Sequence, residues 1–266
     1  MTLPETQYIE LERDGAWLTI WFNQPEKRNP MTDEMVEELL KVFTAIKPSR
    51  EIRGVTLRGR GGVFCAGGDL KSFKNSFQVE ANPDTIMTMS RGVADLLDTF
   101  NALPQVTIVL IEGAAMAGGF GLTCCADVVI CEADAKFAMT ETMIGLSPAQ
   151  IAPFIIQRLG YSTARRLMLT GARFKGDQAC KLGLANFIAD DVAGLEAHEA
   201  QIRKQVLRAA PGAVADTKAL ILELPTLTRQ EQIEAAANNF TRRMLSNEAK
   251  DGIASFFEKR KPKWAE

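Results

Sequence analysis

The sequence predicts an α/β core that is followed by a helical C-terminal region. Short β-prone segments alternate with helical segments through the first half of the chain, and two of these strands run directly into glycine-rich turns. From about Pro148 onward the apolar pattern is helical almost throughout. A chain of 266 residues, of which 46% are hydrophobic, is long enough to bury a core of this kind.

The chain begins with a predicted hairpin and an amphipathic helix. Residues 8–12 and 16–22 flank Asp14-Gly15, a dipeptide typical of a tight turn between antiparallel strands. Thr32 is placed to cap the helix that follows. The apolar face of that helix would consist of Met35, Val36, Leu39, Leu40 and Phe43.

The next two strands each lead into a glycine-rich turn. Residues 53–58 form a predicted strand that runs into the turn at 59–69. The apolar strand at 106–111, which we expect to be covered on both faces, runs into a second turn at 113–121. The remaining elements of this half are a helix at 86–102, an apolar helix at 122–126 and strands at 128–131 and 136–139.

Helical patterns dominate the end of the chain. They cover residues 193–209, 213–222, 229–245 and 247–259. We therefore divide the chain into a core at residues 1–195 and a helical region at residues 196–266.

The composition argues against several classes of function. With 31 basic and 33 acidic side chains the formal net charge is -2, so no basic face for nucleic acid or anionic lipid is expected. His198 is the single histidine, which leaves almost no material for a histidine-based triad or a multi-histidine zinc site, and we expect no metal. Five cysteines without a CxxC pair and an N-terminus without an apolar signal segment predict a cytoplasmic protein that does not enter a membrane.

The two glycine-rich turns are the leading candidates for chemistry. Glycine lets a backbone approach a ligand closely, and free N–H groups at the start of a helix bind developing negative charge. Glu141 is a third candidate, because it lies in a mostly apolar stretch where burial would raise its pKa toward neutrality and suit it to proton transfer. The alternatives are that both turns merely allow tight packing and that Glu141 is a solvated loop carboxylate or a charge at the N-terminus of a helix.

Motifs along nearly the whole chain resemble the crotonase (enoyl-CoA hydratase/isomerase) superfamily. In order, they are 23–30 (NQPEKRNP), 64–70 (FCAGGDL), 113–119 (GAAMAGG), 125–127 (CAD), 136–137 (KF), 169–171 (LTG), 179–185 (ACKLGLA) and 257–262 (FEKRKP). Each motif is loose alone, whereas the series is specific. The resemblance implies a ClpP-like spiral of repeated ββα units with a helical C-terminal region. It implies no metal or redox cofactor, since coenzyme A enters as part of the substrate.

The resemblance also implies a reaction on acyl-CoA thioesters. The backbone N–H groups of Gly68 and Gly118 would hold an enolate-like anion as an oxyanion hole, and Glu141 would transfer the proton. The best-known hydratases use a second glutamate, which would fall at Gly121 in this chain. Glu141 could therefore act alone or together with a carboxylate that the substrate supplies.

Residues 144–153 narrow the resemblance to bacterial hydratases of 3-branched glutaconyl-CoA esters. The similarity is greatest to isohexenylglutaconyl-CoA hydratases of acyclic-terpene breakdown, followed by methylglutaconyl-CoA hydratases of leucine breakdown. The expected reaction is the addition of water across the C2–C3 double bond. An enoyl-CoA isomerase and a non-catalytic binding protein of the same fold are the alternatives. A branched acyl chain could be lined by Phe73, Phe77, Met87, Met116, Phe120 and Met143.

Substrate contacts and self-association follow from the same resemblance. The substrate-binding candidates in the core are Lys27, Arg28, Ala66, Asp69, Leu70, Lys71, Gly119 and Gly121. Phe256 and Lys259 resemble C-terminal residues that cover the coenzyme A of a neighbouring subunit. We therefore expect a homo-oligomer, a trimer or a dimer of trimers, that is built through the C-terminal helices.

Overall fold

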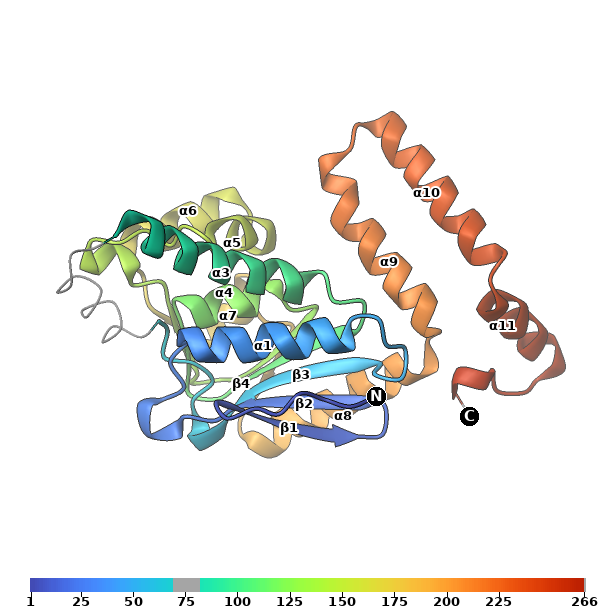
Figure 1. The fold of residues 1–266 in the computed structure, drawn as a ribbon, viewed down its shortest axis with the longest axis horizontal. Coiled ribbons are helices and arrows are strands. Elements are labelled where there is room, and N and C mark those ends of the chain that lie inside the picture. The colour runs from blue at the N-terminus through green and yellow to red at the C-terminus, as the bar shows by residue number, and fades with distance from the viewer. Residues whose placement is uncertain (69–81, 266) are drawn as a thin grey trace.

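A computed structural model describes residues 1–68 and 82–265 (Figure 1). Its main sheet has six strands in the order β1-β2-β3-β4-β6-β9, in which β1 and β2 pair antiparallel and the other neighbours pair parallel. The strands are β1 (Ile9–Asp14), β2 (Trp17–Phe22), β3 (Gly54–Gly59), β4 (Val106–Ile111), β6 (Val128–Glu132) and β9 (Phe187–Ala189). The predicted α/β class is confirmed.

The predicted hairpin is present, and its first strand extends two residues beyond the predicted end, to Asp14. Ile9 pairs with Phe22 at one end and Asp14 with Trp17 at the other. Gly15 turns the chain with a φ of +57°, a conformation that glycine adopts without strain.

A small second sheet has the order β5-β7-β8 and sits beside the main sheet. It consists of β5 (Ala114–Met116), β7 (Lys136–Ala138) and β8 (Phe174–Lys175). β5 interrupts the predicted turn at 113–121, and β8 and β9 interrupt the region after Pro148, for which the pattern predicts helix almost throughout. These strands have only two or three residues, too few to establish an alternating pattern.

Helices cover both faces of the main sheet. On one face lie α1 (Asp33–Ile46), α3 (Pro83–Asn101) and α4 (Gly118–Cys125), and their apolar residues join the larger core cluster. On the opposite face α8 (Val192–Arg208) places Leu195 and Ile202 against β4 and β6, in a separate cluster that includes Trp17 (Figure 1). The short helices α5 (Ala152–Leu159), α6 (Tyr161–Thr170) and α7 (Gly176–Lys181) follow β7 along the chain, and their buried residues join the same larger cluster.

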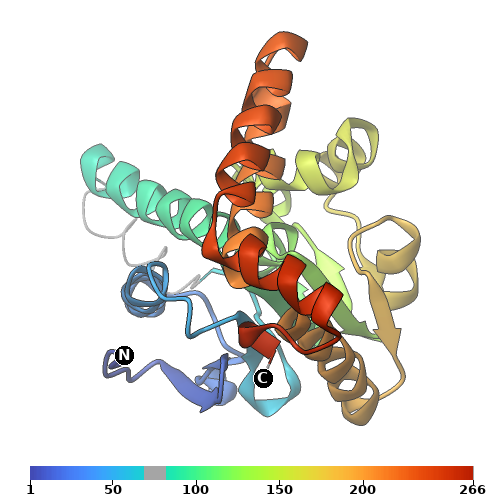
Figure 2. The same ribbon diagram turned by 90° about the vertical axis from the view of Figure 1, so that its right-hand side faces the viewer.

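The last helices project from the core. They are α9 (Pro211–Glu223), α10 (Arg229–Met244) and α11 (Asn247–Glu258), which agree with the predicted spans to within about two residues. Figure 2 shows α9 and α10 standing away from the body, while α11 turns back toward it. Large apolar side chains on this arm are exposed, with Phe240 at 68%, Leu245 at 72% and Phe256 at 79%. In the described chain no helix is both long and apolar enough to cross a membrane.

Candidate active site

The two glycine-rich turns lie side by side although they are far apart in the sequence. The Cys65 N–H donates to Ala114 O at 3.0 Å, and the Met116 N–H donates to Cys65 O at 3.0 Å. These two bonds make a parallel bridge between Cys65 and Ala115, so the first turn extends the small sheet beyond β5. The structure thus joins the turns that the sequence predicts only separately.

The Gly68 N–H is oriented by the carbonyl of its own peptide group. Gly67 O accepts from the Met31 N–H at 2.8 Å. Because C=O and N–H point in opposite directions across a trans peptide, the Gly68 N–H points away from Met31. Within residues 1–68 and 82–265 it has no protein acceptor, and Gly68 is half-buried. It is therefore available to a ligand oxygen.

The Gly118 N–H is the first of helix α4. Ala117 O accepts from the Gly121 N–H at 3.0 Å, so the peptide between Ala117 and Gly118 aims its N–H out of the helix N-terminus. No described residue accepts from it, and the helix dipole adds to its attraction for negative charge. Gly118 thus offers a second donor next to the first.

Close packing restricts the size of the side chain at the second donor, Gly118, and at Gly119 directly after it. A Cβ at Gly119 would lie 2.6 Å from the Cβ of Cys65, and one at Gly118 would lie 3.1 Å from the sulfur of Met31. Gly119 is buried, so it serves the approach of α4 to the first turn. Packing therefore accounts for a glycine at 119, whose predicted contact with substrate stays a prediction, while Gly68 and Gly118 keep donors without a partner among the described residues.

Glu141 reaches the same edge of the small sheet. β5 and β7 are parallel, and the carboxyl end of β5 leads to Gly118 while that of β7 leads to Glu141, the first residue of a 3-10 turn (Glu141–Ile144). The Ala117 N–H donates to Ala138 O at 3.0 Å and ties the two strand ends together. Carboxyl ends of neighbouring parallel strands are where open α/β sheets bind ligands.

The environment of the Glu141 carboxyl group favours its protonated form. Its Oε2 is buried and has no hydrogen-bond partner among the described residues. Burial raises the pKa of Glu141, and the opposing effect of its own backbone N–H is smaller. A carboxylate that is destabilised by burial is a stronger base near neutral pH than an ordinary glutamate. The solvated-loop alternative does not fit this environment.

Gly121 faces a side chain rather than an open space. A Cβ at Gly121 would lie 2.2 Å from Cγ2 and 2.9 Å from Cβ of Ile151, whose side chain is only 4% exposed. Ile151 fills the volume next to the helix where the family resemblance places a second glutamate. Sequence reasoning missed Ile151, since nothing in an apolar segment indicates which helix it packs against.

The predicted coenzyme A contacts fall in three places. Lys27 and Arg28 are exposed, and Arg28 O accepts from the Ala66 N–H at 3.0 Å, which joins this loop to the first glycine turn. Phe256 and Lys259 lie at the end of α11, away from the turns of their own chain (Figure 1). Asp69, Leu70, Lys71, Phe73 and Phe77 lie outside the described residues.

The residues that we expect to line the acyl chain of the substrate differ in how deeply they are buried. Phe120 is fully buried in the core, whereas Met87 and Met143 are 47% and 57% exposed. Met116 is half-buried at the end of β5, two residues before the Gly118 donor. Phe120 is equally near to Gly118 along the chain, but it belongs to the packed core.

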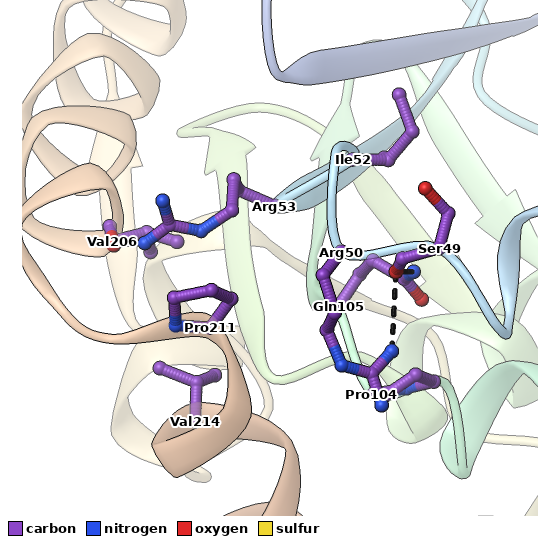
Figure 3. Close-up of a pocket in the computed structure, with 9 residues that line it drawn as sticks. All are labelled: Ser49, Arg50, Ile52, Arg53, Pro104, Gln105, Val206, Pro211 and Val214. Carbon is purple, nitrogen blue, oxygen red and sulfur yellow. Dashed lines mark hydrogen bonds between the residues drawn. The ribbon is translucent and has the colours of Figure 1, made fainter. Parts of the chain in front are cut away.

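A separate small cavity of about 10 Å³ lies between the core and α9 (Figure 3). Arg53 donates to the carbonyls of Val206 and Trp264, each at 3.2 Å, and to that of Ala209. These contacts fix the end of α8 and the C-terminal segment to the core. The cavity holds no more than about one water molecule, so it is not a substrate site.

The residues that the structure describes include no group of three or more His, Cys, Asp or Glu side chains placed to hold a metal ion. The features that could act on a ligand are instead two backbone donors and one carboxyl group at a single edge. Together with the repeated strand–strand–helix units, such as β1-β2-α1 and β4-β5-α4, they define a crotonase-type protein.

Comparison with known proteins gives the same class. Residues 12–266 match the enoyl-CoA hydratase/isomerase family, so the chain belongs to this family and has the crotonase fold that its motifs predict. The structure of Pseudomonas aeruginosa AtuE has 41% sequence identity and a TM-score of 0.95, and the match covers 98% of this chain and 100% of that one. An enoyl-CoA hydratase/isomerase from Marinobacter aquaeolei has 38% identity and a TM-score of 0.94, with 97% and 99% covered.

A curated relative shows the same relationship in sequence. The "Enoyl-CoA hydratase domain-containing protein 2, mitochondrial" of Mus musculus is 32% identical over 272 aligned residues, which cover 98% of this chain and 88% of the relative. The similarity therefore extends over both the core and the C-terminal helices.

Proposed function

We propose that the protein is an enoyl-CoA hydratase that acts on a 3-branched glutaconyl-CoA thioester, of the isohexenylglutaconyl-CoA type. The observation that carries the proposal is the meeting of two unpaired backbone donors, Gly68 N–H and Gly118 N–H, with the half-buried Glu141 at one sheet edge. Membership of the enoyl-CoA hydratase/isomerase family supports it.

In the proposed mechanism Glu141 first acts as a base. It takes a proton from a water molecule whose oxygen bonds to C3 of the enoyl thioester. The C2–C3 π electrons move toward the thioester, and the resulting enolate oxygen accepts hydrogen bonds from Gly68 and Gly118. Protonated Glu141 then returns the proton to C2, which restores the thioester carbonyl. Each backbone donor would stabilise the transition state by about 3 to 4 kcal/mol.

The packing of Ile151 favours a mechanism with one enzyme carboxylate. Because Ile151 fills the space beside Gly121, a substrate carboxylate cannot take the place of a second glutamate there without displacing it. We infer that Glu141 carries out both proton transfers. The distal carboxylate of the substrate would then contribute to binding.

We propose that the coenzyme A moiety lies along the first glycine turn. Exposed Lys27 and Arg28 would contact its phosphates as cations, and Ala66, which the backbone bond to Arg28 holds in place, would lie beside them. We propose contacts with coenzyme A for Asp69, Leu70 and Lys71 as well, and these residues lie outside the described part of the chain.

We propose a homo-oligomer, a trimer or a dimer of trimers, in which Phe256 and Lys259 cover the coenzyme A of a neighbouring subunit. The exposed apolar side chains of α10 and α11 support burial of this arm in an assembly. We further propose that the protein is cytoplasmic and needs no cofactor besides the coenzyme A of its substrate.

An enoyl-CoA isomerase is the second candidate, favoured by the single carboxylate. It would move the double bond by shuttling a proton on Glu141 without adding water. Methylglutaconyl-CoA hydratase is the closest alternative substrate assignment, and a non-catalytic binding protein of the same fold would turn over no acyl-CoA.

Turnover in ¹⁸O-labelled water separates these candidates. Isohexenylglutaconyl-CoA, methylglutaconyl-CoA and crotonyl-CoA are each incubated with the wild type and with Glu141→Gln, and the products are analysed by mass spectrometry. We expect ¹⁸O in the product of the branched substrates with the wild type. Migration of the double bond without label would identify an isomerase, and turnover of crotonyl-CoA alone would refute the branched substrate. A lack of turnover of all three would refute both enzymes.

A further inference from the structure

Ala117 has a backbone conformation that L-amino acids rarely adopt. Its φ is 46° and its ψ is -115°, directly between β5 and the first residue of α4. A side chain in such a region costs free energy, and the conformation persists only where neighbouring structure enforces it. Ala117 immediately precedes the Gly118 donor.

Backbone bonds on both sides hold Ala117 in this conformation. Its N–H donates to Ala138 O at 3.0 Å, and its carbonyl accepts from the Gly121 N–H at 3.0 Å. The preceding Met116 is fixed by its bond to Cys65 O. The chain therefore has a single residue in which to change direction from the sheet into the helix.

The methyl group of Ala117 lies against the residue that precedes the other donor. Gly67 has a φ of +100°, and a Cβ built on it would be 3.1 Å from the Ala117 Cβ and 3.4 Å from Met116 O. The two turns therefore meet at Gly67 and Ala117. Each of these residues precedes one N–H of the oxyanion hole.

We propose that Ala117 is a positioning residue, whose methyl group acts as a spacer that sets the separation and direction of the Gly68 and Gly118 N–H groups. The proposal rests on the oxyanion hole of the proposed function. A glycine at 117 would adopt the same backbone angles without strain but would remove the spacer. A serine would keep the Cβ and hence the spacer.

The test compares Ala117→Gly and Ala117→Ser with the wild type. With the substrate that the wild type turns over, we expect kcat of Ala117→Gly to fall about tenfold, less than the hundredfold or more that loss of a whole donor costs. KM should change less than twofold, the melting temperature should stay or rise, and Ala117→Ser should retain the wild-type kcat. The control is Gly183→Ala, at an exposed turn where glycine has a φ of +81°. This variant changes backbone strain far from the donors, and we expect its kcat to equal that of the wild type.

Infrared difference spectra of bound butyryl-CoA, labelled with ¹³C at the thioester carbonyl, give a readout of the donors without turnover. The wild type should lower the carbonyl stretching frequency relative to free butyryl-CoA, and Ala117→Gly should lose part of that shift. A wild type without any shift would refute the oxyanion hole itself. A wild-type shift that Ala117→Gly retains in full, with kcat within twofold, would refute the role of Ala117.

Discussion

Buried polar groups are paired differently at the edge of the small sheet that carries Gly68, Gly118 and Glu141 than on the α8 face of the main sheet. At the edge, two glycine N–H groups and Glu141 Oε2 have no partner among the described residues. Under α8, the fully buried Thr56 accepts from Trp17 Nε1 at 2.8 Å and donates to Glu199 Oε1 at 2.6 Å.

Arg58 extends the paired arrangement on the α8 side. Its Nε donates to Glu112 at 2.6 Å and its guanidinium also bonds Glu196 at 2.9 Å. A buried polar group without a partner costs free energy, whereas a satisfied pair does not. Other buried atoms, such as Gln24 Nε2 and Gln105 Oε1, also lack a partner among the described residues, but only at the edge of the small sheet do two backbone donors meet a carboxyl group, as the proposed function requires.

The largest expected effect is that of Glu141→Gln on activity. The amide keeps the shape of the side chain but cannot take up the proton, so kcat should fall about 1,000-fold. Steady-state kinetics with the substrate identified by the ¹⁸O experiment measure this loss. Glu37→Gln is the matched control, since Glu37 is exposed and its one ion pair among the described residues is with Lys41 at 3.7 Å. Unchanged turnover by Glu141→Gln would exclude the proposed mechanism.

On the opposite face, Arg58→Met should reduce stability rather than catalysis. It leaves the Glu112 carboxylate, whose side chain is 11% exposed, without its cation, and the free energy of unfolding should fall by about 3 kcal/mol. Urea titration measures this change, and kcat of the folded enzyme should stay within twofold. The control is Arg13→Met, which removes an exposed ion pair with Glu51 and should cost about 1 kcal/mol or less. Equal losses for both variants would contradict the distinction between the two faces.

The pH dependence of the edge should follow the ionisation of Glu141. Burial raises the pKa of Glu141, and its ionised form is the base. As pH falls through this raised pKa, kcat/KM should decrease about tenfold per pH unit, an effect of about 1.4 kcal/mol for each unit. Stability changes in the opposite direction, because the protonated group fits the buried site and its contribution is lost as pH rises through the same pKa. A kcat/KM that stays constant down to the pKa of an exposed glutamate would contradict this assignment.

The sequence predicts helices, strands and candidate site residues well where the pattern that indicates them is contiguous. The Asp14-Gly15 hairpin and the long helices each depend on neighbouring residues and are present in the structure, whereas the second glycine turn contains β5 and the start of α4. Glu141 could be identified because an acidic residue interrupts an apolar stretch.

Features that depend on contacts between distant segments could not be predicted. Neither the packing of Ile151 on Gly121 nor the contact between Gly67 and Ala117 has a local signal. The positive φ of Ala117 could not be predicted either, because a glycine at this position would have suggested such a conformation whereas an alanine does not. The partners of Arg58 are likewise Glu112, directly after β4, and Glu196 on α8, which pattern alone cannot bring together.

The smallest expected effect concerns the coupling between Gly121 and Ile151. Gly121→Ala alone should lower the free energy of unfolding by about 1 to 3 kcal/mol, because its Cβ would collide with Ile151. Ile151→Ala alone should cost about 2 to 4 kcal/mol through the cavity that it opens. In the double variant the new methyl group occupies part of that cavity, so the loss should be about 1 kcal/mol smaller than the sum.

A matched pair on the α8 face tests whether this coupling is local. Ile202 is buried on α8, in a different core cluster from Ile151. Gly121→Ala combined with Ile202→Ala should therefore give additive losses in urea titrations. Additivity for Ile151 as well would mean that Ile151 does not close the space beside Gly121. A substrate carboxylate could then lie there, and the inference that Glu141 carries out both proton transfers would lose its structural support.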